Sequence, residues 1–154
     1  MTSADFIAAI KSAAKESAHI TGIPASFIIA QAALESGWGG SQLARVAYNL
    51  FGIKAGQGWK GNVITLPTRE CIAGKWLTVN AEWRKYSGWL EAINDHAKFL
   101  ILNPRYRLAM TGQRTGDDFA RQVALAGYAT DPNYFEKITA IIRQHHLDQY
   151  DRKD

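Results

Sequence analysis

The segment from residue 24 to residue 40 constrains the fold of this chain more than any other. Residues 24–36 read PASFIIAQAALES and are apolar on almost every side, which predicts a buried central helix. Pro24 suits the first position of a helix and Gly37 the position just past its end, so both boundaries are marked. A glycine-rich turn that carries Trp38 follows directly.

One carboxylate, Glu35, interrupts this apolar helix in its final turn. The C-terminal end of a helix disfavours negative charge and so do apolar neighbours, and both effects raise the pKa of a carboxyl group. A carboxylic acid that stays protonated near neutral pH is what a general acid must be. The same local pattern fits a surface acid at a helix end, with Trp38 as a packing residue, and both interpretations stay open at this point.

Composition and charge narrow the range of partners. The chain has 154 residues, and we expect a single domain over residues 1–154. A formal net charge of +4 suits an anionic polymer, but the basic residues are scattered, so nucleic acid is not an expected partner. Cys71 is the only cysteine, which excludes an intramolecular disulfide. Because neither a membrane-spanning run nor a signal peptide is recognisable, we expect synthesis in the cytoplasm without stable membrane insertion.

Residues 1–86 read as helices followed by a small β lobe. Helical periodicity covers residues 3–20, with Ser3 as N-cap and Gly22 as stop, then residues 24–36 and a short turn near residues 41–47. β-like residues on both sides of a turn at residues 73–75 predict a hairpin lobe over about residues 62–86.

Helical signals then return to the end of the chain. Ser87 is the expected cap of a helix that stops at Asn103, and Asp131 with Pro132 opens the last helix, which runs through Leu147. Between them we expect short helices over residues 104–110 and 115–127. The fold class is therefore mainly α within α+β, a helical body with a β-hairpin lobe that flanks a cleft. Such clefts are where extended polymers bind.

Glycoside hydrolysis suits such a cleft and commonly uses two carboxyl groups on opposite sides of the scissile bond. With Glu35 as the acid, the second group must come from another element, and the hairpin supplies Glu70 and Glu82. Glu70 is our preferred candidate, because a mobile lobe could carry it over the cleft. Glu82 stands beside Trp83 and Arg84, where a cross-strand ion pair is an equal alternative.

Seven short motifs are distributed between residues 31 and 132. They are residues 31–39 (QAALESGWG), 48–54 (YNLFGIK), 59–61 (WKG), 68–70 (TRE), 84–86 (RKY), 103–106 (NPRY) and 126–132 (AGYATDP). In these motifs the chain resembles the endo-β-N-acetylglucosaminidase family of peptidoglycan hydrolases, and especially its flagellar rod-assembly members. The resemblance implies a lysozyme-like fold and cleavage of the glycan strand on the reducing side of N-acetylglucosamine.

The resemblance also assigns roles to particular residues. It implies that Glu35 is the proton donor, that Glu70 is the second carboxylate, and that Tyr128 contacts a substrate group or steadies the developing charge. Arg69 stands where the family has threonine, and Cys71 where an aromatic residue is common, so this chain departs from the family's pattern on both sides of Glu70.

Further candidates for contact with sugar are the aromatic and amide side chains near the motifs, each with core packing as its alternative. They are Trp38, Asn49, Phe51, Trp59 and Tyr134. We expect no metal and no other cofactor, since the adjacent His145 and His146 do not share a helix face and no His-Glu-x-x-His motif occurs. Asp131 is expected to be a helix cap.

Together these observations predict a monomeric peptidoglycan hydrolase that acts on the glycan strands of the cell wall. A phage or prophage endolysin that reaches the periplasm through a holin fits a chain with no export signal, and an autolysin is the alternative origin. A muramidase or lytic transglycosylase on the same fold is the nearest alternative activity. A non-catalytic wall-binding module is an alternative from another class of protein, and a nucleic-acid binder is a more distant one.

Overall fold

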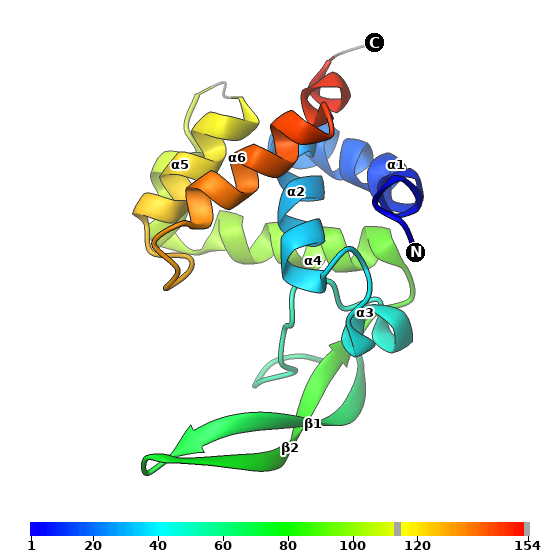
Figure 1. The fold of residues 1–154 in the computed structure, drawn as a ribbon, viewed down its shortest axis with the longest axis vertical. Helices are drawn as coiled ribbons and strands as arrows, with labels where there is room; N and C mark the ends of the chain where they lie inside the picture. Colours follow the sequence, from blue (N-terminus) through cyan, green and yellow to red (C-terminus); the bar gives the residue numbers. More distant parts are fainter. Residues whose placement is uncertain (113–114, 153–154) are drawn as a thin grey trace.

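The computed structural model describes residues 1–112 and 115–152, in which helices form the body and one hairpin projects from it (Figure 1). The elements are α1 (Ser3–Thr21), α2 (Ala25–Ser36), α3 (Gln42–Ala47), β1 (Asn62–Ile72), β2 (Lys75–Lys85), α4 (Trp89–Leu102), η1 (Pro104–Met110), α5 (Gly116–Leu125), α6 (Tyr134–Gln144) and η2 (Leu147–Asp151). The mainly helical α+β class predicted from the sequence is confirmed. Among the described residues, no helix is long and apolar enough to cross a membrane.

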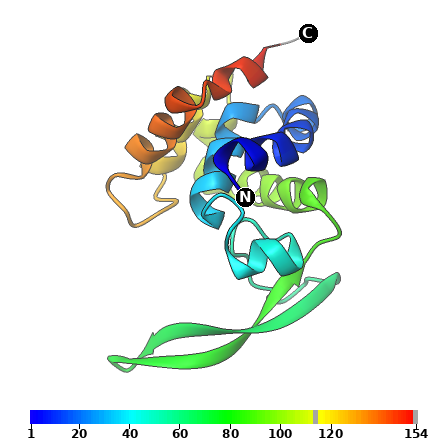
Figure 2. The ribbon, with the colours of Figure 1, turned by 45° about the vertical axis from the view of Figure 1, so that its right-hand side comes forward.

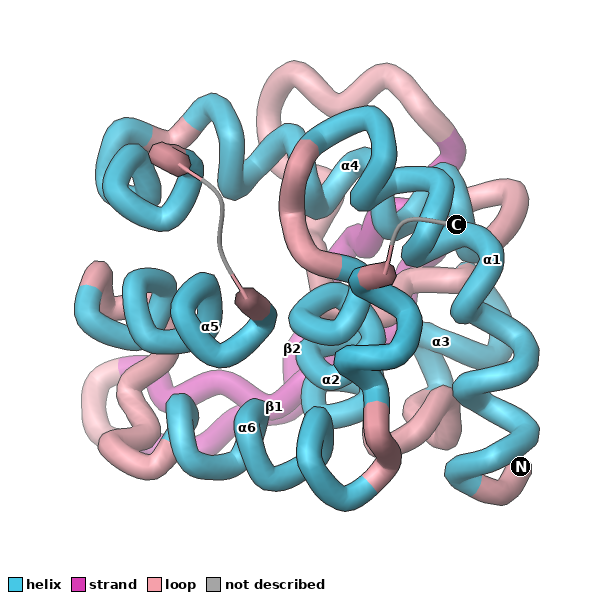
Figure 3. The backbone as a smooth tube through the Cα atoms, turned by 90° about the horizontal axis from the view of Figure 1, so that it is seen from above, coloured by secondary structure: helices cyan, strands magenta, loops and turns pink. Residues whose placement is uncertain are grey.

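α2 is the helix around which the body is built. Every residue from its start through Ala33 is buried, and the helix contacts α1, α5, α6 and η2. Figure 3 shows it near the middle of the helical body. Phe27 of α2 packs against Phe119 of α5 with ring centroids 4.7 Å apart. A helix that lacks a polar face has to be covered on every side, so its composition explains its central place.

Both ends of α2 are held by specific contacts. At its N-terminal end, the carboxylate of Asp151 accepts hydrogen bonds from the Ser26 backbone N–H at 2.8 Å and the Ser26 hydroxyl at 2.5 Å. The negative charge therefore lies at the positive end of the helix dipole. At its C-terminal end, Gly37 adopts the left-handed conformation, with φ of 57°, and its N–H bonds to Ala33. Glu35 is thus fixed in the last turn, as the sequence predicts.

The hairpin of β1 and β2 lies within the range that the sequence predicts for a β lobe. Its strands pair antiparallel from Asn62 with Lys85 to Ile72 with Lys75, around a turn at residues 73–74. The two turn residues, Ala73 and Gly74, have positive φ of 53° and 81°. Positive φ at both positions is typical of the two-residue turns whose twist matches that of the paired strands. Figure 2 shows that the tip extends well away from the helices. At the base, Lys54 forms a β-bridge with Trp83, which ties the hairpin to the loop before it.

Three predicted helix starts are wrong by one or two residues. Thr2, and not Ser3, caps α1: its hydroxyl accepts from the Asp5 N–H, and the Asp5 carboxylate accepts from the Thr2 N–H. This reciprocal pair satisfies two free backbone donors, which a cap at the next residue would not. Gly88, and not Ser87, is the cap position of α4.

The remaining differences concern α4 and the last helix. The Ser87 hydroxyl donates to the Glu91 side chain at 2.7 Å rather than capping the backbone. Asp131 accepts from the Asn133 N–H at 2.9 Å, so it stabilises the turn that precedes α6. The predicted last helix is also interrupted at His146, whose φ of 51° separates α6 from η2.

Candidate active site

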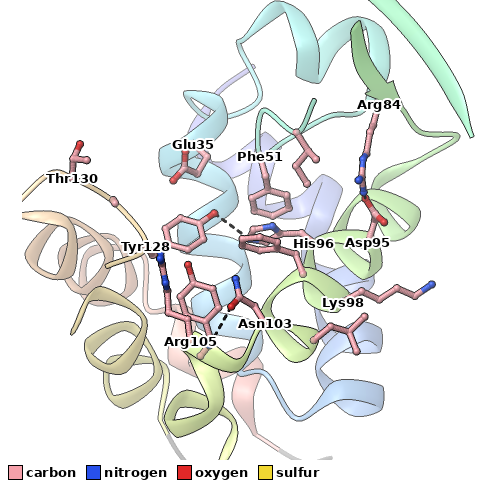
Figure 4. A pocket seen from close by; sticks show the side chains of 15 residues that line it. Glu35, Phe51, Arg84, Asp95, His96, Lys98, Asn103, Arg105, Tyr128 and Thr130 are labelled. Atoms are coloured by element: carbon pink, nitrogen blue, oxygen red, sulfur yellow. Dashed lines mark hydrogen bonds and ion pairs between the residues drawn. The ribbon is translucent and has the colours of Figure 1, made fainter. Parts of the chain in front are cut away.

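A cleft of about 980 Å³ lies where the C-terminal end of α2 meets α4, η1 and the loop between α5 and α6. Its lining residues are Glu35, Phe51, Ile53, Arg84, Asp95, His96, Lys98, Phe99, Leu102, Asn103, Arg105, Tyr106, Tyr128, Ala129 and Thr130. The hairpin supplies only Arg84, from its base, so the floor comes from α4 and not from the β lobe. Figure 4 shows Glu35 and Tyr128 on one side of this cleft and Arg84 with Asp95 on the other.

Glu35 lies on the wall of the cleft, at the end of α2. The residue is exposed on the open side, while the protein packed behind the carboxyl group removes water from it and raises its pKa. A hydrogen bond from the Tyr134 hydroxyl to Glu35 Oε1, at 3.3 Å, acts in the opposite direction and is the weaker effect. The pKa of Glu35 is therefore raised overall, as a general acid requires.

Buried polar groups connect Glu35 to the floor of the cleft. Gln31, which is 1% exposed, donates from Nε2 to the Tyr134 hydroxyl at 2.8 Å, and its Oε1 lies 2.9 Å from His96 Nε2. The Tyr128 hydroxyl lies 3.3 Å from the same His96 nitrogen. We call these residues the Gln31 network. It consists of Gln31, Glu35, His96, Tyr128 and Tyr134.

The direction of the hydrogen bonds in the Gln31 network follows from the amide of Gln31. Its Oε1 can only accept, so His96 must carry its hydrogen on Nε2, and we assign that tautomer. The other ring nitrogen, Nδ1, is buried and has no hydrogen-bond partner within the described chain. Burial lowers the pKa of His96 to about 3, which keeps the ring neutral. Each donor from His96 through Gln31 and Tyr134 then points toward Glu35.

Tyr128 and Phe51 complete the floor around His96. Phe51 stacks on the His96 ring, with centroids 3.9 Å apart, and it lines the cleft. Tyr128 also lines it, and its ring stacks with Tyr134 at 5.5 Å. His96 Nε2 has one hydrogen, which goes mainly to Gln31 Oε1 at 2.9 Å, and the Tyr128 oxygen at 3.3 Å shares it as a second, weaker acceptor. The Tyr128 hydroxyl hydrogen is thus left to point toward the cleft. Burial raises the pKa of the Tyr128 hydroxyl, so it stays protonated.

Glu70, the predicted second carboxylate, lies outside the set of residues that line the cleft. It stands on β1 opposite Leu77, and its carboxylate forms an ion pair with Lys54 at 2.5 Å. Lys54 follows the loop of Phe51 and Ile53, so this ion pair connects Glu70 to the edge of the cleft. Glu82 is exposed and pairs in register with Thr65, and no ion pair is found for it among the described residues.

Three predicted sugar contacts have partners inside the protein. Trp38 packs edge-on against Phe6 and His145, with centroids 5.9 and 4.8 Å away. Asn49 is buried and makes three hydrogen bonds to backbone groups, two with Ile53 and one with Arg84. Neither side chain is among the described residues that line the cleft.

Trp59 lies beside the base of the hairpin. Its Nε1 donates to the Asn62 carbonyl at 2.9 Å, and its ring lies 4.6 Å from the Arg84 guanidinium. Trp59 is not part of the described lining of the cleft either. Tyr134 is buried: its hydroxyl contacts Glu35 and Gln31, and its ring stacks on Tyr128.

The sequence did not identify the polar residues of α4 that line the site. Asp95 accepts from Arg84 Nη1 at 2.7 Å and from the Tyr86 hydroxyl at 2.6 Å, which locks the base of the hairpin onto α4. His96 lies one residue further on and is buried. One feature of the sequence could have identified them: the adjacent ionisable residues Asp95 and His96 interrupt an apolar helix face, as Glu35 interrupts α2.

Comparison with known proteins shows the family and the fold of this chain. A family model described as mannosyl-glycoprotein endo-beta-N-acetylglucosaminidase, Glucosaminidase, matches residues 11–147. The peptidoglycan hydrolase FlgJ of Salmonella typhimurium is 44% identical over 146 residues, which are 92% of this chain and 46% of FlgJ. The exo-glucosaminidase LytG of Bacillus subtilis is 41% identical over 130 residues, 82% of this chain and 45% of LytG. The chain thus spans about half the length of these curated relatives.

Among solved structures, the catalytic domain of the autolysin Auto from Listeria monocytogenes superposes with a TM-score of 0.85 at 34% identity. The match covers 97% of this chain and 87% of that domain. The helical body, the projecting hairpin and the acid at the end of the buried helix define a lysozyme-like α+β fold of the kind found in glycoside hydrolase domains. The chain belongs to the glucosaminidase family, as the sequence motifs predict.

Proposed function

We propose that this chain is a glycoside hydrolase that cuts the glycan strand of peptidoglycan at the β-1,4 linkage of N-acetylglucosamine, with Glu35 as general acid. The observation that carries the proposal is the position of Glu35, on the wall of an open cleft with a raised pKa and one oxygen held by Tyr134. Membership of the glucosaminidase family supports the substrate class.

The geometry suggests how Glu35 delivers its proton. Because Tyr134 donates to Oε1, that oxygen acts as an acceptor, and the acidic proton belongs on Oε2. Proton transfer from Oε2 to the glycosidic oxygen breaks the bond to the leaving sugar and leaves an oxocarbenium-like centre on N-acetylglucosamine. The Tyr128 hydroxyl lines the same cleft and is free to donate to the substrate, for example to the 2-acetamido carbonyl.

Two routes complete the reaction, and they assign different roles to Glu70. As a base, Glu70 would activate water and invert the configuration at the anomeric carbon. With the acetamido oxygen of the substrate as nucleophile, the configuration would be retained and Glu70 would be less important. The ion pair with Lys54 connects Glu70 to the edge of the cleft, and the attachment of Glu70 to a projecting hairpin supports an approach to the cleft on substrate binding.

The experiment compares wild type with Glu35→Gln on purified Gram-negative sacculi, followed by mass spectrometry of the fragments. We expect clearing by the wild type only, with new N-acetylglucosamine reducing ends. Reducing N-acetylmuramic acid would instead indicate a muramidase, and anhydro ends a lytic transglycosylase. Binding without cleavage by either protein would replace the proposal with a wall-binding module. The anomer formed first, read by NMR, distinguishes the two routes for Glu70.

The biological setting belongs to the same proposal. We infer a monomeric lytic enzyme of phage or prophage origin that acts on the wall after release through a holin. The net charge of +4 suits binding to an anionic wall. Expression with and without a holin tests this setting: lysis that needs the holin is expected, and lysis in its absence would indicate an autolysin with another export route.

A further inference from the structure

One part of the cleft carries charges that the cleavage reaction does not use. Lys98, Phe99 and Leu102 of α4 and Arg105 of η1 all line it, and we call these four residues the cationic shelf. In Figure 4, Lys98 and Arg105 both lie below Glu35, with Lys98 to the right of His96 and Arg105 to the left, beneath Tyr128. The shelf is therefore continuous with the site but separate from the acid.

The two positive charges of the shelf are uncompensated. The third cation of the cleft, Arg84, is neutralised by Asp95 at 2.7 Å, and Asp95 is also bound by the Tyr86 hydroxyl. Lys98 and Arg105 form no ion pair with any described residue, and both side chains are exposed. The only other carboxylate among the lining residues is Glu35, whose raised pKa favours its neutral form. This part of the cleft is thus electropositive and suits an anionic group.

Apolar surface accompanies the two cations. Leu102 is 76% exposed and Phe99 is 47% exposed, although both are large hydrophobic residues at the edge of a cleft. Leu102 follows Lys98 by four positions, which places both on one face of α4. An apolar surface of this kind at the edge of a binding cleft is open to the apolar part of a ligand.

The sugars of a glycan strand do not match this combination. A polymer of N-acetylglucosamine has no carboxylate, whereas each muramic acid of peptidoglycan bears a lactyl-linked stem peptide with free carboxylates and alanine methyl groups. We propose that the cationic shelf binds the carboxylates of the stem peptide next to the scissile bond and makes the enzyme prefer strands whose peptide carboxylates are free. This inference rests on the proposed function, because it needs peptidoglycan in the cleft.

The test compares soluble peptidoglycan strands with the same strands after their peptide carboxylates have been converted to amides, which removes the negative charge but keeps the glycan and the peptide. The variant is Lys98→Gln with Arg105→Gln, and the matched control is Lys11→Gln with Arg107→Gln, which removes the same charge from α1 and η1 outside the cleft. The measured quantity is the ratio of kcat/KM for strands with free peptide carboxylates to that for the amidated strands. We expect the ratio to exceed one for the wild type and the control, and to fall about tenfold in the shelf variant, as for two partly exposed charge contacts.

Added salt provides a second measurement. Because exposed charges are screened, raising the ionic strength should lower the ratio for the wild type and leave it nearly constant for the shelf variant. A ratio that is the same in the wild type and the shelf variant would overturn the inference while leaving the proposed function in place. Failure of the wild type to cleave either substrate would overturn the proposed function, and the shelf inference with it.

Discussion

The Tyr134 hydroxyl lies 3.3 Å from Glu35 Oε1 and joins the first turn of α6 to the last turn of α2. Two opposing effects therefore meet at one carboxyl group. Desolvation raises its pKa, and the hydrogen bond from Tyr134 restrains that rise. The position of α6 thus influences both the protonation and the orientation of the acid.

Tyr134→Phe should move the alkaline limb of the kcat/KM profile to higher pH. A general acid works only when protonated, so activity falls as the pH rises through the pKa of Glu35. Removing the hydrogen bond from Tyr134, which lowers the pKa of Glu35, raises that pKa further. The alkaline limb of the kcat/KM profile then moves to higher pH with it. We expect kcat to fall because Oε1 is no longer held, but by less than the about 10²–10⁴-fold that loss of the acid costs.

The matched control for this profile is Tyr48→Phe. The Tyr48 hydroxyl makes no hydrogen bond with the described residues, and Tyr48 packs against Trp89 at a centroid distance of 4.6 Å, outside the cleft lining. Its profile should match that of the wild type. If the alkaline limb of the Tyr134→Phe profile stays in place or moves to lower pH, Tyr134 does not lower the pKa of Glu35.

Gln31→Met tests whether the Gln31 network acts as a unit. The substitution keeps the approximate volume but removes the donor to Tyr134 and the acceptor for His96. We expect it to lower kcat, and to lower the free energy of unfolding by about 1–3 kcal/mol because the buried His96 N–H loses its partner. In a double-mutant cycle with Tyr134→Phe, the loss of kcat should be smaller than the product of the single losses. Independent effects would mean that Gln31 contributes only to packing.

The sequence predicted those features that a local pattern determines. Glu35 was found because a single carboxylate in the last turn of an apolar helix is unusual on its own. Gln31 stands in the same helix, but its role depends on Tyr134 and His96, which are distant in sequence. The surroundings of Glu70 were likewise not predictable, because its partner Lys54 comes from a loop and not from the paired strand. Periodicity gives which face of an element is buried, but not which polar groups meet across elements.

His96 should make the protein less stable in acid. The pKa of His96 is about 3 in the folded protein against an ordinary value of 6.5. Below pH 6.5, His96 therefore binds a proton in the unfolded chain but stays neutral in the folded protein. The contribution of neutral His96 to the free energy of unfolding is thus fully present above pH 6.5. It is lost as the pH falls toward 3, at about 1.4 kcal/mol per pH unit.

Urea unfolding at pH 7 and pH 5 measures this loss. Between these values His96 should account for about 2 kcal/mol of the decrease, and His96→Gln should remove that part while keeping a donor for Gln31. The other histidines lie outside the buried core, and His19→Gln is the control that should keep the wild-type decrease. An equal decrease in the wild type and in His96→Gln would show that His96 takes up a proton in the folded state.

Asp151→Ala should destabilise the helix that carries the acid. Its carboxylate accepts from both the N–H and the hydroxyl of Ser26, so its removal leaves the first turn of α2 without its partner. Loss of such a cap costs about 1–2 kcal/mol, a few degrees in Tm for a protein of this size.

Asp148→Ala, in the same short helix, is the matched control, because Asp148 is exposed and makes no hydrogen bond with a described side chain. Equal Tm values for the two variants would contradict the cap. Because Gly37 ends α2 independently, kcat measured well below the Tm should stay the same, which separates the stability of α2 from the chemistry at Glu35.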